Sequence, residues 1–180
     1  SAVRIVVGTE GHSIPGALTI DDMLSGAPAD MIEVESSHPA AYMFTSGTAG
    51  SPKAAVLTHN NLLTNIHQAN VAEHIGPDDV TFGVLPLFHI FGLNVVLGTT
   101  FAGGGCVVLV QRFDPVSAME TIAERKVTVI PGAPSMWMAL AQLDHPTPNG
   151  FAGVRIALSG AAKLPEQISQ SISARFGLQV

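Results

Sequence analysis

The alternation of short apolar runs with helical patterns from residue 40 onward constrains the fold most strongly. Residues 106–110 form one apolar run and residues 127–130 form another. Between them, Asp114 and Pro115 supply the N-cap and first-turn residues with which helices often begin. A strand, a helix and a second strand of this kind form a β-α-β unit with a parallel strand pair and a right-handed crossover. We therefore predict an α/β fold with a mainly parallel sheet flanked by helices.

The other expected elements follow the same periodicity. Residues 8–38 are rich in Gly, Ser, Pro and acidic residues, which indicates a connecting segment with one helical turn near residues 21–24. We predict a connecting segment with a short strand over residues 1–38 and a partial domain over residues 39–180. The expected strands are 3–7, 40–44, 80–85 and 154–158, and the expected helices are 58–74, 89–101, 134–143 and 165–177.

The inward faces of two helices are predicted from spacings of three and four residues. In the helix capped by Thr58, the inward residues are expected to be Leu62, Ile66 and Ala69. In the helix capped by Asp114, they are expected to be Val116, Met119, Ile122 and Ala123.

The composition is unusually apolar for a soluble domain. The chain is 47% hydrophobic and 12% charged, against about 25% charged residues in an average domain. We expect that part of its surface is normally covered, by the remainder of a longer parent chain or by self-association through exposed apolar faces. The net charge is −6 and the eight basic residues form no run, so nucleic acid is not an expected partner.

Two features bear on location. Cys106 is the only cysteine and no signal peptide is visible, so we expect a reduced, cytoplasmic setting. No charged residue occurs between Val80 and Gln111, but Pro86, His89 and the glycines at 103–105 interrupt this stretch. We therefore expect no transmembrane segment.

Residues 45–53, Thr-Ser-Gly-Thr-Ala-Gly-Ser-Pro-Lys, follow an apolar run at 40–44 that predicts a buried strand. Glycines allow close approach of the backbone, and amides, hydroxyls and one lysine can donate to anionic oxygens. A surface loop is the ordinary interpretation of such a cluster, and the loop lacks the Gly-Lys-Ser/Thr ending of a Walker A motif. The same residues could instead form a phosphate-binding loop, and the candidates for that role are Thr45, Ser46, Gly47, Thr48, Ala49, Gly50, Ser51 and Lys53.

Three later segments supply further candidates. Residues 85–92, Leu-Pro-Leu-Phe-His-Ile-Phe-Gly, place His89 in an apolar run, where a packed core histidine is the ordinary interpretation. Residues 158–164, Leu-Ser-Gly-Ala-Ala-Lys-Leu, form a turn of small residues after an expected strand. Residues 136–138, Met-Trp-Met, could line an apolar tunnel, although core packing is favoured.

In this order, the loop, the Pro-x-Phe-His element and the small-residue turn resemble the adenylate-forming (AMP-binding) superfamily, and within it the fatty-acyl and acyl-CoA synthetases. The resemblance covers residues 38–180, and the chain departs from the phosphate-loop pattern at Ala49 and Ala54. It implies phosphate binding by the loop, with Lys53 and Thr48 taking part in catalysis together with His89 beside the reacting carboxylate. It also implies adenine binding by the turn, whose residues are Ser159, Gly160, Ala161 and Ala162.

The resemblance further implies a two-step reaction. A carboxylic acid and ATP give an acyl-adenylate, and a thiol such as coenzyme A then displaces AMP. Relatives that activate amino acids have aspartate where this chain has His89, so a plain carboxylic acid, with a fatty acid favoured, is the expected substrate. ATP, Mg²⁺ carried by ATP, and coenzyme A are the expected cofactor and co-substrates.

The resemblance also implies parts that this chain does not show. The family's Tyr-Gly-x-Thr-Glu stretch, with its Mg²⁺-binding glutamate, and the mobile C-terminal domain are not found in the sequence. We therefore expect the chain to be a fragment of a large N-terminal domain, inactive alone. A stand-alone nucleotide- or acyl-binding module and a purely structural domain remain alternatives.

Overall fold

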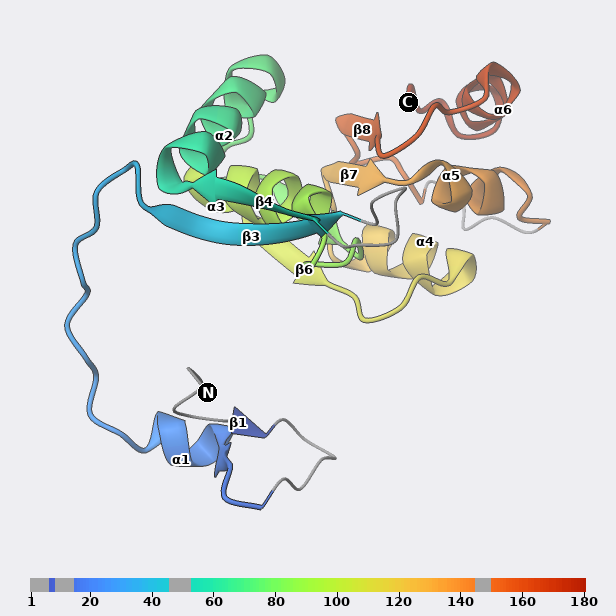
Figure 1. Cartoon of the computed structure of the whole chain (residues 1–180). Helices are drawn as coiled ribbons and strands as arrows, with labels where there is room; N and C mark the ends of the chain where they lie inside the picture. The colour runs from blue at the N-terminus through green and yellow to red at the C-terminus, as the bar shows by residue number, and fades with distance from the viewer. Residues whose placement is uncertain (1–6, 9–14, 46–52, 145–149) are drawn as a thin grey trace. The chain divides into compact units, whose positions relative to one another are not determined.

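The computed structural model describes residues 7–8, 15–45, 53–144 and 150–180. The chain forms two compact units, Ser1–Val34 and Glu35–Val180 (Figure 1). In the first unit, strand β1 (Val7–Gly8) pairs in parallel with β2 (Leu18–Thr19), and helix α1 (Ile20–Leu24) follows. This confirms the helical turn expected at 21–24, whereas most of the strand expected at 3–7 lies outside the described residues.

The second unit contains a four-stranded parallel sheet, which confirms the predicted α/β class. Its strand order is β6-β5-β7-β8, with bounds Val80–Gly83 for β5, Cys106–Leu109 for β6, Val129–Gly132 for β7 and Ile156–Ser159 for β8. The expected direct pairing of β6 with β7 was wrong. Both strands run parallel to β5, which lies between them and pairs with each.

A separate antiparallel hairpin precedes this sheet. Strand β3 (Pro39–Thr45) pairs with β4 (Lys53–Thr58) (Figure 1). The strand predicted at 40–44 is confirmed, but its predicted burial was wrong, because Tyr42 and Phe44 are 60% and 73% exposed. Within the described part of the chain, β3 pairs only with β4. The 45–53 segment therefore joins two hairpin strands and does not follow a strand of the parallel sheet.

The helices lie close to their expected positions. Their bounds are α2 His59–Glu73, α3 Thr99–Ala102, α4 Pro115–Glu124, α5 Pro134–Ala141 and α6 Glu166–Phe176, with the π-helix η1 at Phe91–Gly98. The predicted caps are confirmed: the Thr58 side chain accepts from the Asn61 N–H, and the Asp114 side chain accepts from the Ser117 N–H.

The inward face of α4 differs from the prediction. Ala118, Met119 and Ile122 are buried, whereas Val116 and Ala123 are exposed. The buried residues lie on the side of the helix that carries Ala118, and positions 116 and 123 lie outside that side. On α2, the expected inward residues are only half-buried, and the helix has no fully buried residue.

The core lies between the parallel sheet and helices α4 to α6. Trp137, Phe82 and Ile172 are fully buried there, and Met136 is 6% exposed. The Trp137 indole also donates to the carbonyl of Leu158 at 3.3 Å. This confirms core packing for Met136 and Trp137, whereas the same prediction for Met138 was wrong, because that residue is 40% exposed. Among the described residues, no helix is long and apolar enough to cross a membrane.

The strand order determines where a ligand can bind. The chain leaves β5 toward β6 on one side, and then returns past β5 to β7 and β8 on the other. Since parallel crossovers are almost always right-handed, the two directions place their helices on opposite faces. The carboxyl ends of β5 and β7 thus flank a switch point, the position at which such sheets bind ligands.

Candidate functional site

A pocket of about 450 Å³ lies next to the segment that follows β5. Two motif-bearing parts of the sequence contribute to it, the His89 segment with η1 and the turn after β8, together with the end of β4. The first half of α2 forms a further wall. The lining residues are Leu57, Asn61, Leu62, Asn65, His89, Ile90, Phe91, Asn94, Val95 and Ala161. The volume suits a small organic ligand, for which pockets of roughly 300–1,000 Å³ are usual.

The π-helix η1 shapes one wall of this pocket. Its bonds run from residue i to residue i+5, as in the Thr99 N–H donating to the carbonyl of Asn94. Such helices are rare and often occur at functional sites. Gly98 lets α2 approach η1 closely, because a Cβ at this position would lie 2.7 Å from Cδ1 of Ile66. The sequence predicted a helix here but gave no sign of its π geometry.

His89 lies at the pocket with an exposed side chain. Its Nδ1 accepts a hydrogen bond from the Phe91 N–H at 3.1 Å. A nitrogen that accepts cannot carry the proton, so the neutral ring has its proton on Nε2. The side chain is therefore a pocket residue with an oriented Nε2–H donor, and the interpretation as a packed core histidine is wrong.

The turn after β8 lies at the same pocket through Ala161. The Gly160 N–H donates to the Gly132 carbonyl at 3.0 Å, which fixes the start of the turn to β7. Ala161 has a left-handed φ of 68°, and both Ala161 and Ala162 are exposed. The hydroxyl of Ser159 is buried and has no hydrogen-bond partner among the described residues. The turn thus presents open backbone and small side chains.

The predicted phosphate loop falls mostly outside the described residues. Ser46, Gly47, Thr48, Ala49, Gly50 and Ser51 lie there. Its two ends are described: Thr45 ends β3, and the exposed Lys53 begins β4 opposite it in the hairpin register. Strand β4 then extends from Lys53 to the pocket, which Leu57 lines. The hairpin therefore connects one end of the loop to the pocket wall.

Three asparagines at the pocket were missed in the sequence. Asn61 and Asn65 lie four residues apart on α2, so they share one face of the helix. Asn94 lies on η1, is 3% exposed, and donates from Nδ2 to Asn65 Oδ1 at 2.7 Å. The sequence did contain a signal for Asn94. An amide within the uncharged apolar run 80–111 needs a polar partner when it is buried.

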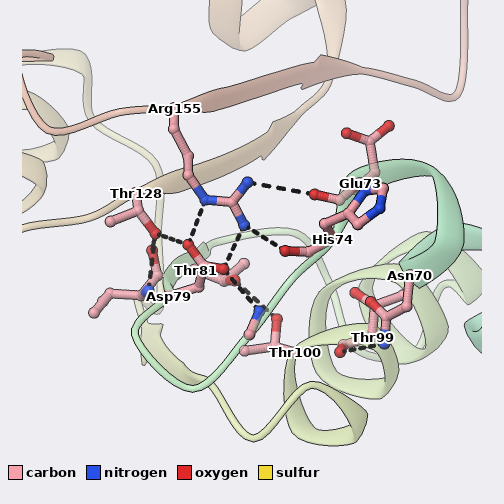
Figure 2. A network of polar contacts seen from close by, with 11 residues as sticks. Asn70, Glu73, His74, Asp79, Thr81, Thr99, Thr100, Thr128 and Arg155 are labelled. Carbon is pink, nitrogen blue, oxygen red and sulfur yellow. Dashed lines mark hydrogen bonds and ion pairs between the residues drawn. The ribbon is translucent and has the colours of Figure 1, made fainter.

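A network of polar contacts, here called the clamp, lies at the amino ends of strands β5, β7 and β8 (Figure 2). Arg155, just before β8, donates from Nε to Asp79 Oδ1 at 2.7 Å and pairs through Nη2 with Asp79 Oδ2. Its guanidinium also donates to the last carbonyls of α2, those of Glu73 and His74. Asp79 in turn accepts from the Thr128 hydroxyl at 2.7 Å. The clamp therefore joins the end of α2 to the residues that immediately precede β5, β7 and β8.

The clamp shifts the protonation of Asp79. The hydrogen bonds from Arg155 hold the pKa of the Asp79 carboxyl well below its usual range, and bonds from the Gly76 N–H and Thr128 act in the same direction. Burial of the Asp79 carboxyl raises its pKa, but this effect is smaller than the combined lowering by the hydrogen bonds. Asp79 also raises the pKa of the Arg155 guanidinium. Both groups are therefore charged at neutral pH.

Comparisons with known proteins identify the family that this chain resembles. The family model for AMP-binding enzyme matches residues 3–180. The chain is 36% identical over 149 residues to 4-coumarate–CoA ligase 2 of Nicotiana tabacum, covering 81% of this chain and 28% of that protein. It is 35% identical over 178 residues to 4-coumarate–CoA ligase 2 of Oryza sativa subsp. japonica, covering 95% of this chain and 31% of that protein.

Solved structures give the same result. ATP-bound MatB from Rhodopseudomonas palustris superposes with a TM-score of 0.83 at 29% identity, over 92% of this chain and 35% of that one. A malonyl-CoA ligase with methylmalonyl-CoA and AMP bound superposes with a TM-score of 0.85 at 27% identity. The match covers 98% of this chain and 40% of that one. The chain thus spans less than half the length of each relative. It belongs to the adenylate-forming, AMP-binding enzyme family, and the relatives it matches are CoA ligases.

Proposed function

We propose that this chain forms the acid- and adenosine-binding part of an ATP-dependent acid–thiol ligase. The supporting observation is that one pocket is lined by His89, by Ala161 of the small-residue turn, and by Leu57 of the strand that begins at Lys53. These segments lie far apart in the sequence. Two of these segments follow the carboxyl ends of β5 and β8. This position, in a member of this enzyme family, favours an acid and a nucleotide as ligands.

The proposed chemistry has two balanced steps. A carboxylate oxygen attacks the α-phosphorus of ATP, forming an acyl-adenylate as the bond to the leaving pyrophosphate breaks. The sulfur of a thiol, proposed to be coenzyme A, then attacks the acyl carbon while the thiol proton is lost to solvent, and AMP leaves with the bonding electron pair. Positioning of the reactants and stabilisation of charge are the main tasks of the protein in such transfers.

His89 is proposed to orient the acid. Its Nε2–H can donate to a carboxylate oxygen while Nδ1 stays bonded to the Phe91 N–H. A neutral donor fits a plain carboxylic acid and offers no counter-ion for the ammonium group of an amino acid. Two of the named relatives are 4-coumarate–CoA ligases and one is a malonyl-CoA ligase, so these relatives give no support to a fatty acid in particular.

The nucleotide is proposed to bind at the turn and the loop. The exposed, small Ala161 and Ala162 leave the backbone accessible to a flat base, which fits adenine. The hydroxyls of Thr45, Ser46, Thr48 and Ser51 and the Lys53 ammonium are proposed to donate to the β- and γ-phosphates. Mg²⁺ is proposed to arrive bound to the phosphates of ATP. In the described part of the chain, no group of three His, Cys, Asp or Glu residues is arranged to hold a metal.

Carboxylate-dependent exchange of pyrophosphate into ATP tests the proposal. The gene product that contains this chain would be assayed with ATP, Mg²⁺ and a panel of aliphatic and aromatic acids, and coenzyme A would be added in a second series. We expect exchange with at least one acid, and thioester plus AMP when coenzyme A is present. Nucleotide binding without exchange for any acid would favour the binding-module alternative.

The 180-residue chain alone should show no exchange. A charge-assisted hydrogen bond gives about 1.5–3 kcal/mol, whereas association costs roughly 4–15 kcal/mol. A partial set of contacts leaves little affinity, so we expect millimolar binding of ATP at best. Exchange by the 180-residue chain would contradict the expectation that it is inactive by itself.

A further inference from the structure

The lining of the pocket is mostly apolar, but three amide side chains from α2 and η1 form a polar part of it. Leucine, isoleucine, phenylalanine, valine and alanine side chains supply most of the lining, and three carboxamides stand among them. Two of these are Asn61 and Asn65 of α2, and the third is Asn94 of η1. An amide presents either a donor or an acceptor to a ligand, depending on which atom its internal hydrogen bonds use.

The orientation of Asn61 is set by the backbone. Its Oδ1 accepts from the Thr58 N–H at 3.0 Å and from the Thr58 hydroxyl at 2.9 Å. A backbone N–H can only donate, so the atom facing it must be the amide oxygen. The Nδ2 group of Asn61 is therefore the part of the amide that remains for a ligand.

A backbone carbonyl sets the orientation of the other two amides. Asn94 Nδ2 faces the carbonyl oxygen of Leu62 at 3.4 Å, and a carbonyl can only accept. The same Nδ2 donates to Asn65 at 2.7 Å, so the Asn65 atom in that bond must be Oδ1. The Nδ2 group of Asn65 is then the group left over.

The side of the pocket formed by α2 therefore offers hydrogen-bond donors to a ligand. The amide oxygens of Asn61 and Asn65 are engaged, and neither Nδ2 donates to another residue in the described ranges. Both residues line the pocket and both are exposed. An acyl group without an acceptor would cover these N–H groups and leave them without water or a partner, which is costly.

We propose that this pocket selects carboxylic acids whose acyl group bears an uncharged hydrogen-bond acceptor, such as an ether or carbonyl oxygen, with Asn65 as the main specificity-determining residue. The inference rests on the proposed function, because it treats the ligand as an acid. An uncharged acceptor fits better than a second carboxylate, since the lining is apolar apart from the neutral amides and His89.

Isothermal titration calorimetry tests this selection by measuring the affinity of the gene product for two nearly isosteric acids. 4-Methoxycinnamate and 4-ethylcinnamate differ by an ether oxygen in place of a methylene group. We expect the methoxy acid to bind about three- to tenfold more tightly, the range that one neutral hydrogen bond provides. Equal affinities, a preference for the ethyl acid, or failure of both to bind would overturn the inference.

Variants at Asn65 show whether the amide is responsible. Asn65→Asp keeps an oxygen for Asn94 but removes the donor, so the ratio of the two affinities should fall to about one. Asn65→Leu removes the donor without adding charge and should do the same. Asn60→Asp is the matched control, because Asn60 lies on the same helix but does not line the pocket; it should keep the parental ratio. A ratio unchanged in both Asn65 variants would overturn the proposal.

Pyrophosphate exchange on the same preparations separates the two proposals. Selective binding without exchange would contradict the ligase function and leave the selectivity intact. Exchange at equal efficiency for the two acids, with equal affinities, would overturn only the selectivity.

Discussion

At the scale of single residues, Gly160 links the stability of the fold to the shape of the pocket. A Cβ at this position would lie 2.6 Å from Cε1 and 2.7 Å from Cζ of Phe91, a residue that lines the pocket. We expect Gly160→Ala to lower the free energy of unfolding by about 1–3 kcal/mol, the usual cost of overpacking. Denaturant unfolding monitored by circular dichroism measures this.

The control for that substitution is Gly153→Ala, since a Cβ there would meet only the Val127 carbonyl at 3.6 Å. It should be nearly neutral, and Phe91→Leu combined with Gly160→Ala should recover part of the loss. If Gly160→Ala unfolds at the same denaturant concentration as the parent, the contact is unimportant. The family resemblance seen in the sequence implies adenine binding at this turn of small residues. The structure adds packing against Phe91, which no local pattern could reveal.

At the scale of secondary-structure elements, the Asp79–Arg155 clamp ties the end of α2 to three strands (Figure 2). We expect Asp79→Asn to lower the free energy of unfolding at pH 7 by about 1.5–3 kcal/mol, because bonds to a charged group are lost. Asp78→Asn makes the same change of charge at an exposed neighbour and should have little effect.

The clamp also predicts a pH dependence. Since the folded pKa of Asp79 is lowered, its contribution is fully present above the unfolded pKa of about 4 and is lost as the pH falls toward the folded pKa. The difference in unfolding free energy between parent and Asp79→Asn should therefore shrink below about pH 4. A difference that stays constant from pH 7 to pH 3 would contradict this assignment.

Most elements could be predicted from the sequence, because their signals are local. The caps at Thr58 and Asp114 and the apolar run at 106–110 each depend on a few adjacent residues. The exposure of β3 could not be predicted, since an apolar strand looks the same whether or not another element covers it. The Asn65–Asn94 and Asp79–Arg155 contacts join residues far apart in sequence and follow only from the tertiary structure.

At the scale of the whole molecule, the order of the strands brings the site together. Because β5 lies between β6 and β7, the segment after β5 lies near the turn after β8. The sequence predicted both segments, but it favoured a direct β6–β7 pair. The roles of the individual site residues, the cytoplasmic location, the parts of the parent protein beyond this chain, and self-association all stay predictions.

The most direct test of the central claim is a crystal structure of the gene product with an acyl-adenylate mimic in which a sulfamate replaces the phosphate. We predict adenine against residues 159–162, the acyl carbonyl beside His89, and the acyl group between α2 and η1. A mimic bound elsewhere, with this pocket empty, would contradict the claim that acid and nucleotide meet here.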